Sequence, residues 1–323
     1  MTKELAPIIL FVYNRPDHTR QTVEALQKNE FAEDSVLYVF SDGPKENATQ
    51  EQLEKIQEVR KYIHSINGFK SIHIEESENN KGLANSVIYG VSKVIKQYGS
   101  VIVLEDDLIT HPKFLSFMND GLVAYEKDMR IFNVGGTNYN IKPPKSYKDS
   151  VYIVHRSESC GWGTWKDRWD NIDWNIEDYN SFCKDRKAIR LFNRGGDDMF
   201  RILQLQMKGE VDSWAIRWDY HMYKNNAYCV RPWRSCVSNI GFDGTGIHSG
   251  TMDVSDYNSN FVTSKDFLYS FPNGIKPNRK VEKIFHDYWG NDPRNTLILD
   301  IRKLLKKIKR LVKRIVLSPL NCR

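Results

Sequence analysis

At residues 101–107 the chain reads VIVLEDD, a continuous apolar run that ends in three carboxylates. Such a run is typical of a strand buried on both faces, as the central strands of parallel sheets are. Ligands of open α/β sheets bind beyond the carboxyl ends of the strands, and three adjacent acids there repel one another unless a cation or hydrogen-bond donors hold them. The run therefore predicts a site for Mg²⁺ or Mn²⁺ that also holds phosphate oxygens. The alternative is that Asp106 or Asp107 is the N-cap of a following helix.

The segments before this run alternate between apolar strands and amphipathic helices. Strands are expected at residues 7–12, 36–40, 71–74 and 101–104. Helices are expected at residues 17–28, 49–65 and 82–97. The alternation predicts an α/β fold in which helices flank a mixed, mainly parallel sheet. After about residue 130 the alternation is lost, so we expect one half over residues 1–150, a second half over 151–255 and an extension over 256–296.

Polar residues follow the first two expected strands, at the same edge of the sheet as the acidic triplet. Asn14 and Arg15 follow the first strand, and Asp42 follows the second within the sequence SDGP. An acid at this place binds a ribose hydroxyl or a base N–H, but Asp, Gly and Pro are equally the residues of an ordinary turn. Lys81 and Asn85 stand at the start of the third expected helix, where a helix N-terminus and a lysine favour a phosphate. Plain capping is the alternative there.

Two later motifs combine glycines or an acid with tryptophans. In the sequence SCGWGTW, Gly161 allows the backbone to bend and Trp162 to form a pocket wall, or else the segment is a tight turn that covers the core. Asp219 lies in the sequence WAIRWDYH, where desolvating aromatic neighbours favour a general base. A structural ion pair of Asp219 with Arg217 or Arg231 is the competing interpretation.

A glycine-rich loop is expected at residues 239–250, and it contains His248. Loops of this composition are able to order over a ligand. The histidine would then contact a metal or a diphosphate. The alternative is a flexible surface loop with no ligand.

The charge of the chain is divided unequally along its length. The formal net charge is +6, but residues 301–323 contain nine Lys and Arg and no acid. The first 300 residues hold 38 Lys and Arg against 41 Asp and Glu, and an acidic body argues against nucleic acid as a partner. Five cysteines, an odd number with no zinc-site spacing, favour free thiols in a reducing compartment. Neither a signal peptide nor a transmembrane segment is expected.

Residues 297–323 are expected to form a basic amphipathic helix. Apolar residues from Ile301 to Ile315 fall on one helical stripe, and Lys and Arg occupy the remainder. Such a helix is suited to lie on an anionic membrane surface. The protein is then expected to be cytoplasmic and peripheral on the inner face of the cell membrane. A solvated helix or a contact with another protein are the alternatives.

Taken in order, these motifs resemble a GT-A-type nucleotide-sugar glycosyltransferase, and more narrowly the N-acetylglucosaminyltransferase I group and related bacterial family 2-like sugar transferases. The shared pattern is Glu105-Asp106-Asp107, Gly161-Trp162-Gly163, Trp218-Asp219, Arg231-Pro232 and the loop 241–250. The resemblance covers residues 6–250 and implies a GT-A-like fold. Its first half, 1–150, would bind the nucleotide-sugar, and 151–255 would bind the acceptor. Two departures, Trp162 between the glycines and Tyr220 after Asp219, affect the acceptor side.

The resemblance also implies roles for individual residues. Asp107 would bind Mn²⁺ or Mg²⁺ directly, with Glu105 and Asp106 toward the ribose and the waters of the metal. Asp42 would meet the uridine of a UDP-sugar, the loop with His248 would close over the donor, and Asp219 would be the general base. A single in-line displacement would then invert the anomeric configuration. The acceptor would be a glycan or a lipid-linked saccharide in bacterial surface polysaccharide assembly.

Two other classes of protein remain open from the sequence. A sugar nucleotidyltransferase shares the sheet type but needs a glycine-rich phosphate loop after the first strand, where this chain has YNRP at residues 13–16. A membrane-attached carbohydrate-binding protein would use the eight Trp and sixteen Tyr, but it would not need three carboxylates at a strand end. Such a protein should bind sugar without nucleotide or metal.

Overall fold

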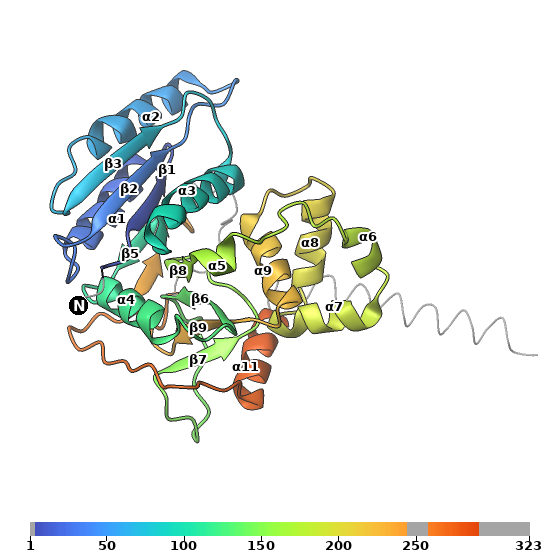
Figure 1. Ribbon diagram of the computed structural model, residues 1–323. Coiled ribbons are helices and arrows are strands. Elements are labelled where there is room, and N and C mark those ends of the chain that lie inside the picture. Colours follow the sequence, from blue (N-terminus) through green and yellow to red (C-terminus); the bar gives the residue numbers. More distant parts are fainter. Residues whose placement is uncertain (1–3, 244–257, 291–323) are drawn as a thin grey trace, which may run out of the picture.

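The computed structural model describes residues 4–243 and 258–290, and its centre is an eight-stranded sheet (Figure 1). The strands are β1 (Ile8–Val12), β2 (Val36–Ser41), β3 (Ser71–Glu76), β4 (Ser100–Glu105), β6 (Ile131–Gly135), β7 (Val151–Val154), β8 (Trp162–Trp165) and β9 (Tyr228–Pro232). Their order across the sheet is β3-β2-β1-β4-β8-β6-β9-β7. A small second sheet pairs β5 (Leu108–Thr110) with β10 (Val237–Asn239) in antiparallel fashion.

The first four strands are parallel, and they are connected by α1 (Pro16–Gln27), α2 (Gln50–Ile63) and α3 (Leu83–Tyr98). Helix α1 has Pro16 in its first turn, and Thr49 and Gln52 form a capping box at the start of α2. Gly99, with a φ of 78°, ends α3 in the left-handed conformation that glycine adopts without strain. The expected fold is confirmed, and every expected bound in this half is within two residues of the observed one.

Each central strand is buried on both faces because its side chains alternate between two hydrophobic cores. In β1, Ile8 and Leu10 point into the core that contains α1 and α2, whereas Ile9 and Phe11 point into the core that contains α3. The strand β4 alternates in the same way. This two-sided burial explains the unbroken apolar runs in the sequence.

The second half of the sheet is mixed. Strand β8 pairs antiparallel with β4 and with β6, β6 and β9 are parallel, and β7 is antiparallel to β9. Strand β8, which follows residue 150 in the sequence, therefore lies between β4 and β6, which precede it, in one continuous sheet. The expected division at that residue does not coincide with a break in the sheet.

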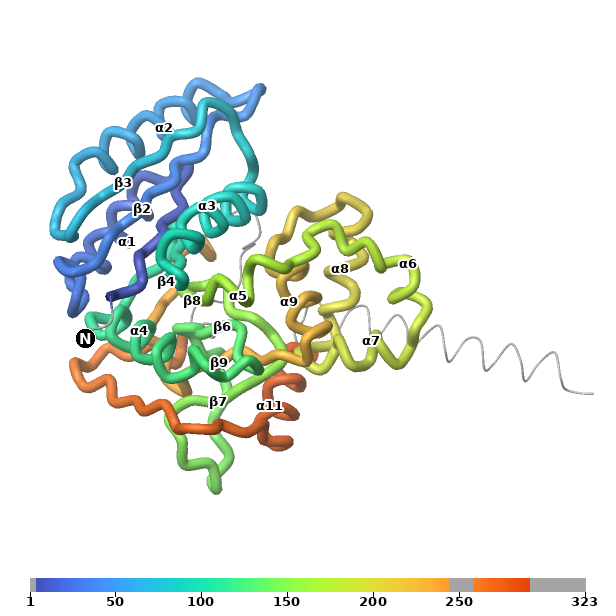
Figure 2. The backbone as a smooth tube through the Cα atoms, viewed as in Figure 1, coloured from blue at the N-terminus to red at the C-terminus, as the bar shows by residue number. Residues whose placement is uncertain are grey.

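A group of short helices lies beside the sheet, as the tube in Figure 2 shows. They are α5 (Lys166–Trp169), α6 (Tyr179–Phe182), α7 (Arg186–Phe192), the short 3₁₀ helix η1 (Asn193–Gly195), α8 (Met199–Met207) and α9 (Trp214–Lys224). A core of their own, with Phe182, Phe192 and Tyr220, holds them together. Trp214 and Trp218 of α9 reach the core beneath α3 and so join this helical group to the sheet.

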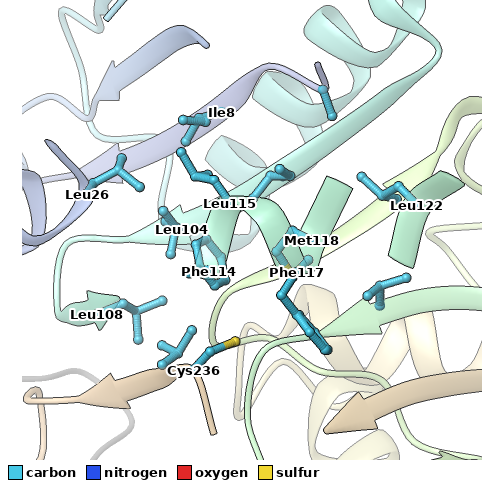
Figure 3. Packing of buried hydrophobic residues seen from close by; sticks show 14 of the residues in the cluster. Ile8, Leu26, Leu104, Leu108, Phe114, Leu115, Phe117, Met118, Leu122 and Cys236 are labelled. Carbon is cyan, nitrogen blue, oxygen red and sulfur yellow. The ribbon is translucent and has the colours of Figure 1, made fainter. Parts of the chain in front are cut away.

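Residues 258–290 pack on helix α4 (Phe114–Ala124) and on the outer strand β7 of the sheet. Phe267 and Phe271 pack on Phe117 of α4, with ring centroids 5.6 and 5.0 Å apart, and extend the core of Figure 3. The last described helix, α11 (Arg279–Gly290), packs against β7 through Phe285, which contacts Tyr152. Among the described helices there is none with the length and apolar character that a membrane span needs.

Candidate active site

The acidic end of β4 opens into a pocket of about 310 Å³ between the sheet and the helical group. Its walls come from the β4–β5 turn, the start of α3, the turn before β8, helix α8 and the segment that leads into α9. The lining residues are Leu83, Glu105, Asp107, Leu108, Ser159, Cys160, Ile202, Val211, Asp212, Ser213, Trp214, Ala215 and Asn239. The pocket therefore lies at the carboxyl end of a central strand, as the sequence predicts.

Arg15 partly neutralises the acidic triplet. Its guanidinium forms ion pairs with Asp106 and with Asp107, and the Nη2–Oδ2 distance to Asp107 is 3.0 Å. Asp106 and Asp107 are both buried and Glu105 is half-buried, and of the three only Glu105 and Asp107 line the pocket. Burial, and then the charges of Asp107 and Asp106, raise the pKa of Glu105 to about 8. Ionising all three acids beside a single guanidinium is therefore unfavourable, and a cation in the pocket would relieve that cost.

The N-cap interpretation of the triplet is wrong. The next helix, α4, begins at Phe114 with Lys113 as its N-cap, and strand β5 separates it from the acids. The carboxylates are therefore not used to cap a helix.

The donor atoms of the triplet fit a divalent cation that is held jointly with a ligand. Among the described residues there is no group of three His, Cys, Asp or Glu side chains that could enclose a metal alone. Mg²⁺ commonly binds through one or two carboxylates and takes its other ligands from water and from substrate phosphates. Asp107, with Glu105 beside it in the pocket, has this donor chemistry. Arg15 Nη1 is buried without a hydrogen-bond partner. A ligand oxygen that accepted a hydrogen bond from it would satisfy this buried donor.

The start of the expected glycine-rich loop lies against Asp107. The Ile240 N–H donates to the Asp107 carbonyl at 2.9 Å, and a Cβ at residue 241 would lie 2.1 Å from Asp107 Oδ2. Only glycine fits at this position, because any side chain would collide with the carboxylate. The remainder of the loop with His248 lies outside the described residues.

Asp42 holds a turn in this structure. Its carboxylate accepts hydrogen bonds from the N–H groups of Gly43, Lys81 and Gly82 and from Asn80 Nδ2, at 2.9–3.1 Å. An ionised carboxylate has about four lone-pair sites, so these donors occupy its capacity. Asp42 therefore fixes the turn before α3, and its expected contact with uridine stays a prediction.

The other residues expected near the donor lie outside the lining of the pocket. Lys81 places its Nζ over the ring of Tyr89, 4.2 Å from the centroid, and Asn85 Nδ2 donates to the Lys81 carbonyl. Asn14 is half-buried beside Arg15 and does not line the pocket. Their phosphate-binding roles stay predictions, and this conformation directs Lys81 to the surface of α3.

Trp162 is part of the core behind the pocket. It is 1% exposed and stacks on Trp214 with ring centroids 4.9 Å apart. Gly161 makes the bend that the sequence predicts, with a φ of 70°. The indole of Trp162 therefore supports the pocket through Trp214, which is one of the lining residues.

Asp219 is buried away from the pocket. It is 5% exposed and accepts a hydrogen bond from the Ser157 N–H at 2.6 Å. Burial raises the pKa of its carboxyl group above the usual range, against the charge of Arg156. The ion pairs considered in the alternative interpretation are not those observed, since Arg217 pairs with a different acid and Arg231 with Glu158.

Asp212 is the acid that sequence reasoning missed. It lines the pocket, immediately before the Ser213 N-cap of α9, and its side chain is 54% exposed. Arg217, one turn into α9, donates to it at 3.3 Å. A Cβ at residue 82 would lie 3.5 Å from its Oδ2, so Gly82 leaves room at this wall. The sequence offered one signal for Asp212, which is its position just before the Trp-containing helix α9.

A buried ion pair fixes the wall of the pocket from behind. Arg231 and Glu158 pair with side chains 0% and 1% exposed, and Arg231 Nη2 donates to the Ser157 carbonyl at 2.6 Å. Glu158 Oε1 accepts from the N–H groups of Ser159 and Cys160, both at 2.9 Å. Ser159 and Cys160, which line the pocket, are thus held by the buried carboxylate of Glu158.

Replacing Arg231 with methionine is expected to lower the free energy of unfolding by about 3 kcal/mol, because Glu158 stays buried without its cation. The same change at Arg130, whose side chain is 45% exposed and pairs with Asp128, should cost less than about 1 kcal/mol. Urea denaturation followed by tryptophan fluorescence measures both. Equal losses for the two variants would contradict a special role of the buried pair.

Comparison with known proteins identifies the class of this chain. Residues 8–194 match the profile of glycosyl transferase family 2, and since the match covers more than half of the sequence, the chain belongs to that family. It is a glycosyltransferase with a GT-A-type fold, which decides against the nucleotidyltransferase and the carbohydrate-binding protein. The narrower resemblance to the N-acetylglucosaminyltransferase I group stays a prediction.

The solved structures that resemble this chain include two of low sequence identity. One is the mannosyltransferase PcManGT from Pyrobaculum calidifontis in complex with GDP-Man and Mn²⁺, with 10% identity, a TM-score of 0.37 and coverage of 70% of this chain and 72% of that one. The other is S. aureus TarS 1-349, with 13% identity, a TM-score of 0.37 and coverage of 72% and 59%. At these scores neither structure bears on the donor or the acceptor of this chain. No curated protein matches the sequence significantly.

Proposed function

We propose that this glycosyltransferase moves a sugar from a nucleoside-diphosphate donor, UDP in our assignment, to a hydroxyl group of a glycan or a lipid-linked saccharide. The observation that carries the proposal is that Asp107 and Asp212 face one pocket at the end of β4. One carboxylate has the chemistry to hold the charge of a diphosphate through a metal, and the other is exposed enough to meet an acceptor. The separation of these two tasks is what a single displacement at the anomeric carbon requires.

On the donor side, Asp107 would hold Mn²⁺ or Mg²⁺, with Glu105 beside it. The metal, when bound, supplies positive charge to the diphosphate as it leaves. Arg15 keeps Asp107 oriented through its ion pair and balances part of the negative charge. Glu105 would stand beside such a cation as a second carboxylate, and its pKa is raised to about 8 by burial and by the charges of Asp107 and Asp106.

On the acceptor side, we propose Asp212 as the general base in place of Asp219. Asp212 lines the pocket, its side chain is 54% exposed, and the Arg217 guanidinium donates a hydrogen bond to its carboxylate at 3.3 Å. Asp219 is buried and already accepts the Ser157 N–H, so it has no path to an acceptor hydroxyl in this conformation. One displacement assisted by Asp212 would invert the anomeric configuration.

The nucleotide is tested by titrating UDP and GDP separately into the protein by calorimetry, with Mn²⁺ and with EDTA. The proposal expects UDP to bind when Mn²⁺ is present and to bind much more weakly in EDTA. If GDP binds and UDP does not, the proposed donor changes from a UDP-sugar to a GDP-sugar. Binding of neither nucleotide would overturn the donor side of the proposal.

The acceptor and the location are proposed from the sequence of residues 297–323. Nine cations without an acid in 301–323, on an amphipathic pattern, are suited to an anionic membrane surface on the cytoplasmic side, where lipid-linked saccharides of bacterial surface polysaccharides would be met. Deleting 297–323 is expected to move the protein from the membrane fraction to the soluble fraction of lysed cells. A variant with these Lys and Arg changed to Gln separates charge from length. Retention of both variants on the membrane would contradict the role of the tail.

A further inference from the structure

A second cleft lies between the helical group and α11, and it shares no residue with the pocket at β4. Its volume is about 610 Å³. Its lining comes from α7, η1, the turn before α8 and α11. The lining residues are Arg186, Ile189, Arg190, Asn193, Arg194, Asp197, Glu282, Lys283 and His286.

Arginines form a row along one wall of this cleft. Arg186, Arg190 and Arg194 follow at intervals of four residues, and such intervals place side chains on one face of a helix. Lys283 and His286, three residues apart on α11, lie on the opposite wall. Four permanent cations thus line the cleft with only two carboxylates, Asp197 and Glu282.

Both carboxylates lie close to histidines, and among the described residues neither forms an ion pair with the arginines of the cleft. Asp197 Oδ1 lies 3.3 Å from His286 Nε2, and Glu282 Oε1 lies 3.8 Å from Nε2 of His155. Lys283 pairs with Asp287, and Arg194 Nη2 donates to Asn226 Oδ1 at 2.7 Å. Arg186 and Arg190 are exposed and have no ion pair or side-chain hydrogen bond among the described residues. The cleft therefore has four permanent cations against two carboxylates, and Arg186 and Arg190 are the cations without a direct partner among the described residues.

The two walls of the cleft are held in place from the core. Val281 and Phe285 anchor α11 in a hydrophobic cluster with Tyr152, and Phe192 anchors α7 in another. Arg156 adds a link, because it pairs with Asp198 at the start of α8 and lies over the ring of Trp289, 3.7 Å from the centroid. The arginine row thus faces a preformed opening, which lowers the cost of ordering side chains around a ligand.

We propose that this cleft is a binding site for a phosphate group. Guanidinium groups bind phosphate oxygens through two parallel hydrogen bonds and are more weakly hydrated than ammonium groups. A row of two unpaired arginines with a third arginine and a lysine nearby matches a phosphate monoester or a diphosphate. The headgroup of a phospholipid and a soluble phosphate compound both carry this chemistry. The site does not depend on the proposed donor or general base.

The test compares two double variants of the full chain, each with two fewer positive charges. Arg186→Gln with Arg190→Gln removes the unpaired arginines, and Lys184→Gln with Lys187→Gln is the matched control, because both lysines are exposed near the same helix and neither lines the cleft. Inorganic pyrophosphate is titrated by calorimetry in EDTA, which keeps metal-dependent binding at β4 out of the signal. Sedimentation with phosphatidylcholine vesicles, with and without phosphatidylglycerol, forms the second arm.

The arginine variant is expected to bind pyrophosphate, or the phosphatidylglycerol vesicles, about tenfold more weakly than the lysine variant. A loss in the pyrophosphate arm identifies a soluble phosphate as a ligand, and a loss confined to the vesicles identifies a lipid headgroup. Equal binding of the two variants in both arms overturns the proposal. Titration of UDP with Mn²⁺ should be the same for both variants, so a failure of the donor assignment is seen separately.

Discussion

Replacing Asp107 with alanine is expected to weaken metal-dependent binding of UDP by about 100-fold and to abolish sugar transfer. Asp107 lines the pocket, and its backbone carbonyl accepts a hydrogen bond from the Ile240 N–H of the 239–243 segment. Without it, the diphosphate would have to hold the cation with Glu105 alone, and Arg15 would keep only Asp106 as its partner. Calorimetry with Mn²⁺ and with EDTA measures the loss directly.

The control is Asp34→Ala. Asp34 is exposed in the turn before β2, at the amino end of the parallel strands, whereas the pocket lies at their carboxyl end, so this variant should bind UDP like the parent protein. Thermal unfolding of the Asp107 variant shows whether the fold is intact, and relief of repulsion among the triplet favours an unchanged or higher midpoint. If the Asp107→Ala protein is folded and keeps full affinity for UDP and Mn²⁺, the assignment of the metal site to the end of β4 is wrong.

The second large effect concerns the general base. Asp212→Asn is expected to lower the rate of sugar transfer by about 10²–10⁴-fold while UDP binding is retained, because the amide cannot accept the proton of the acceptor hydroxyl. Asp219→Asn should keep most of the transfer rate and lose about 1–3 kcal/mol of stability, since it weakens the acceptor of the buried Ser157 N–H. Transfer is measured as nucleotide release in the presence of acceptor, and stability by urea denaturation.

The two asparagine variants are matched because each replaces one carboxyl oxygen with an amide nitrogen and keeps the shape of the side chain. The sequence-based assignment of Asp219 predicts the reverse result, with transfer lost in Asp219→Asn and kept in Asp212→Asn. That reverse result, obtained with a folded Asp219→Asn protein, would restore Asp219 as the base.

The sequence alone predicted the parallel half of the sheet, and it placed the acidic triplet at the strand end where the structure has a pocket. Period-two alternation cannot be seen in strands that are buried on both faces, but the apolar runs and the amphipathic segments between them were sufficient to locate each element. The acids at the end of β4 were sufficient to locate the pocket. These features are local, since propensity, capping and strand-end chemistry depend on neighbours in the chain.

The direction in which each polar side chain points was decided by the tertiary structure. Asp212 and Asp219 are seven residues apart and differ little as sequence signals, but α9 packs Asp219 against the 155–158 segment and leaves Asp212 at the pocket. Asp42 became the acceptor for the turn before α3, and Arg15 became the partner of the triplet, because segments distant in sequence supplied their hydrogen-bond partners. Burial and partner choice depend on what packs against a residue across the sheet. A single sequence therefore determined which elements and which chemistry are present, and only the packed structure determined which carboxylate meets the pocket.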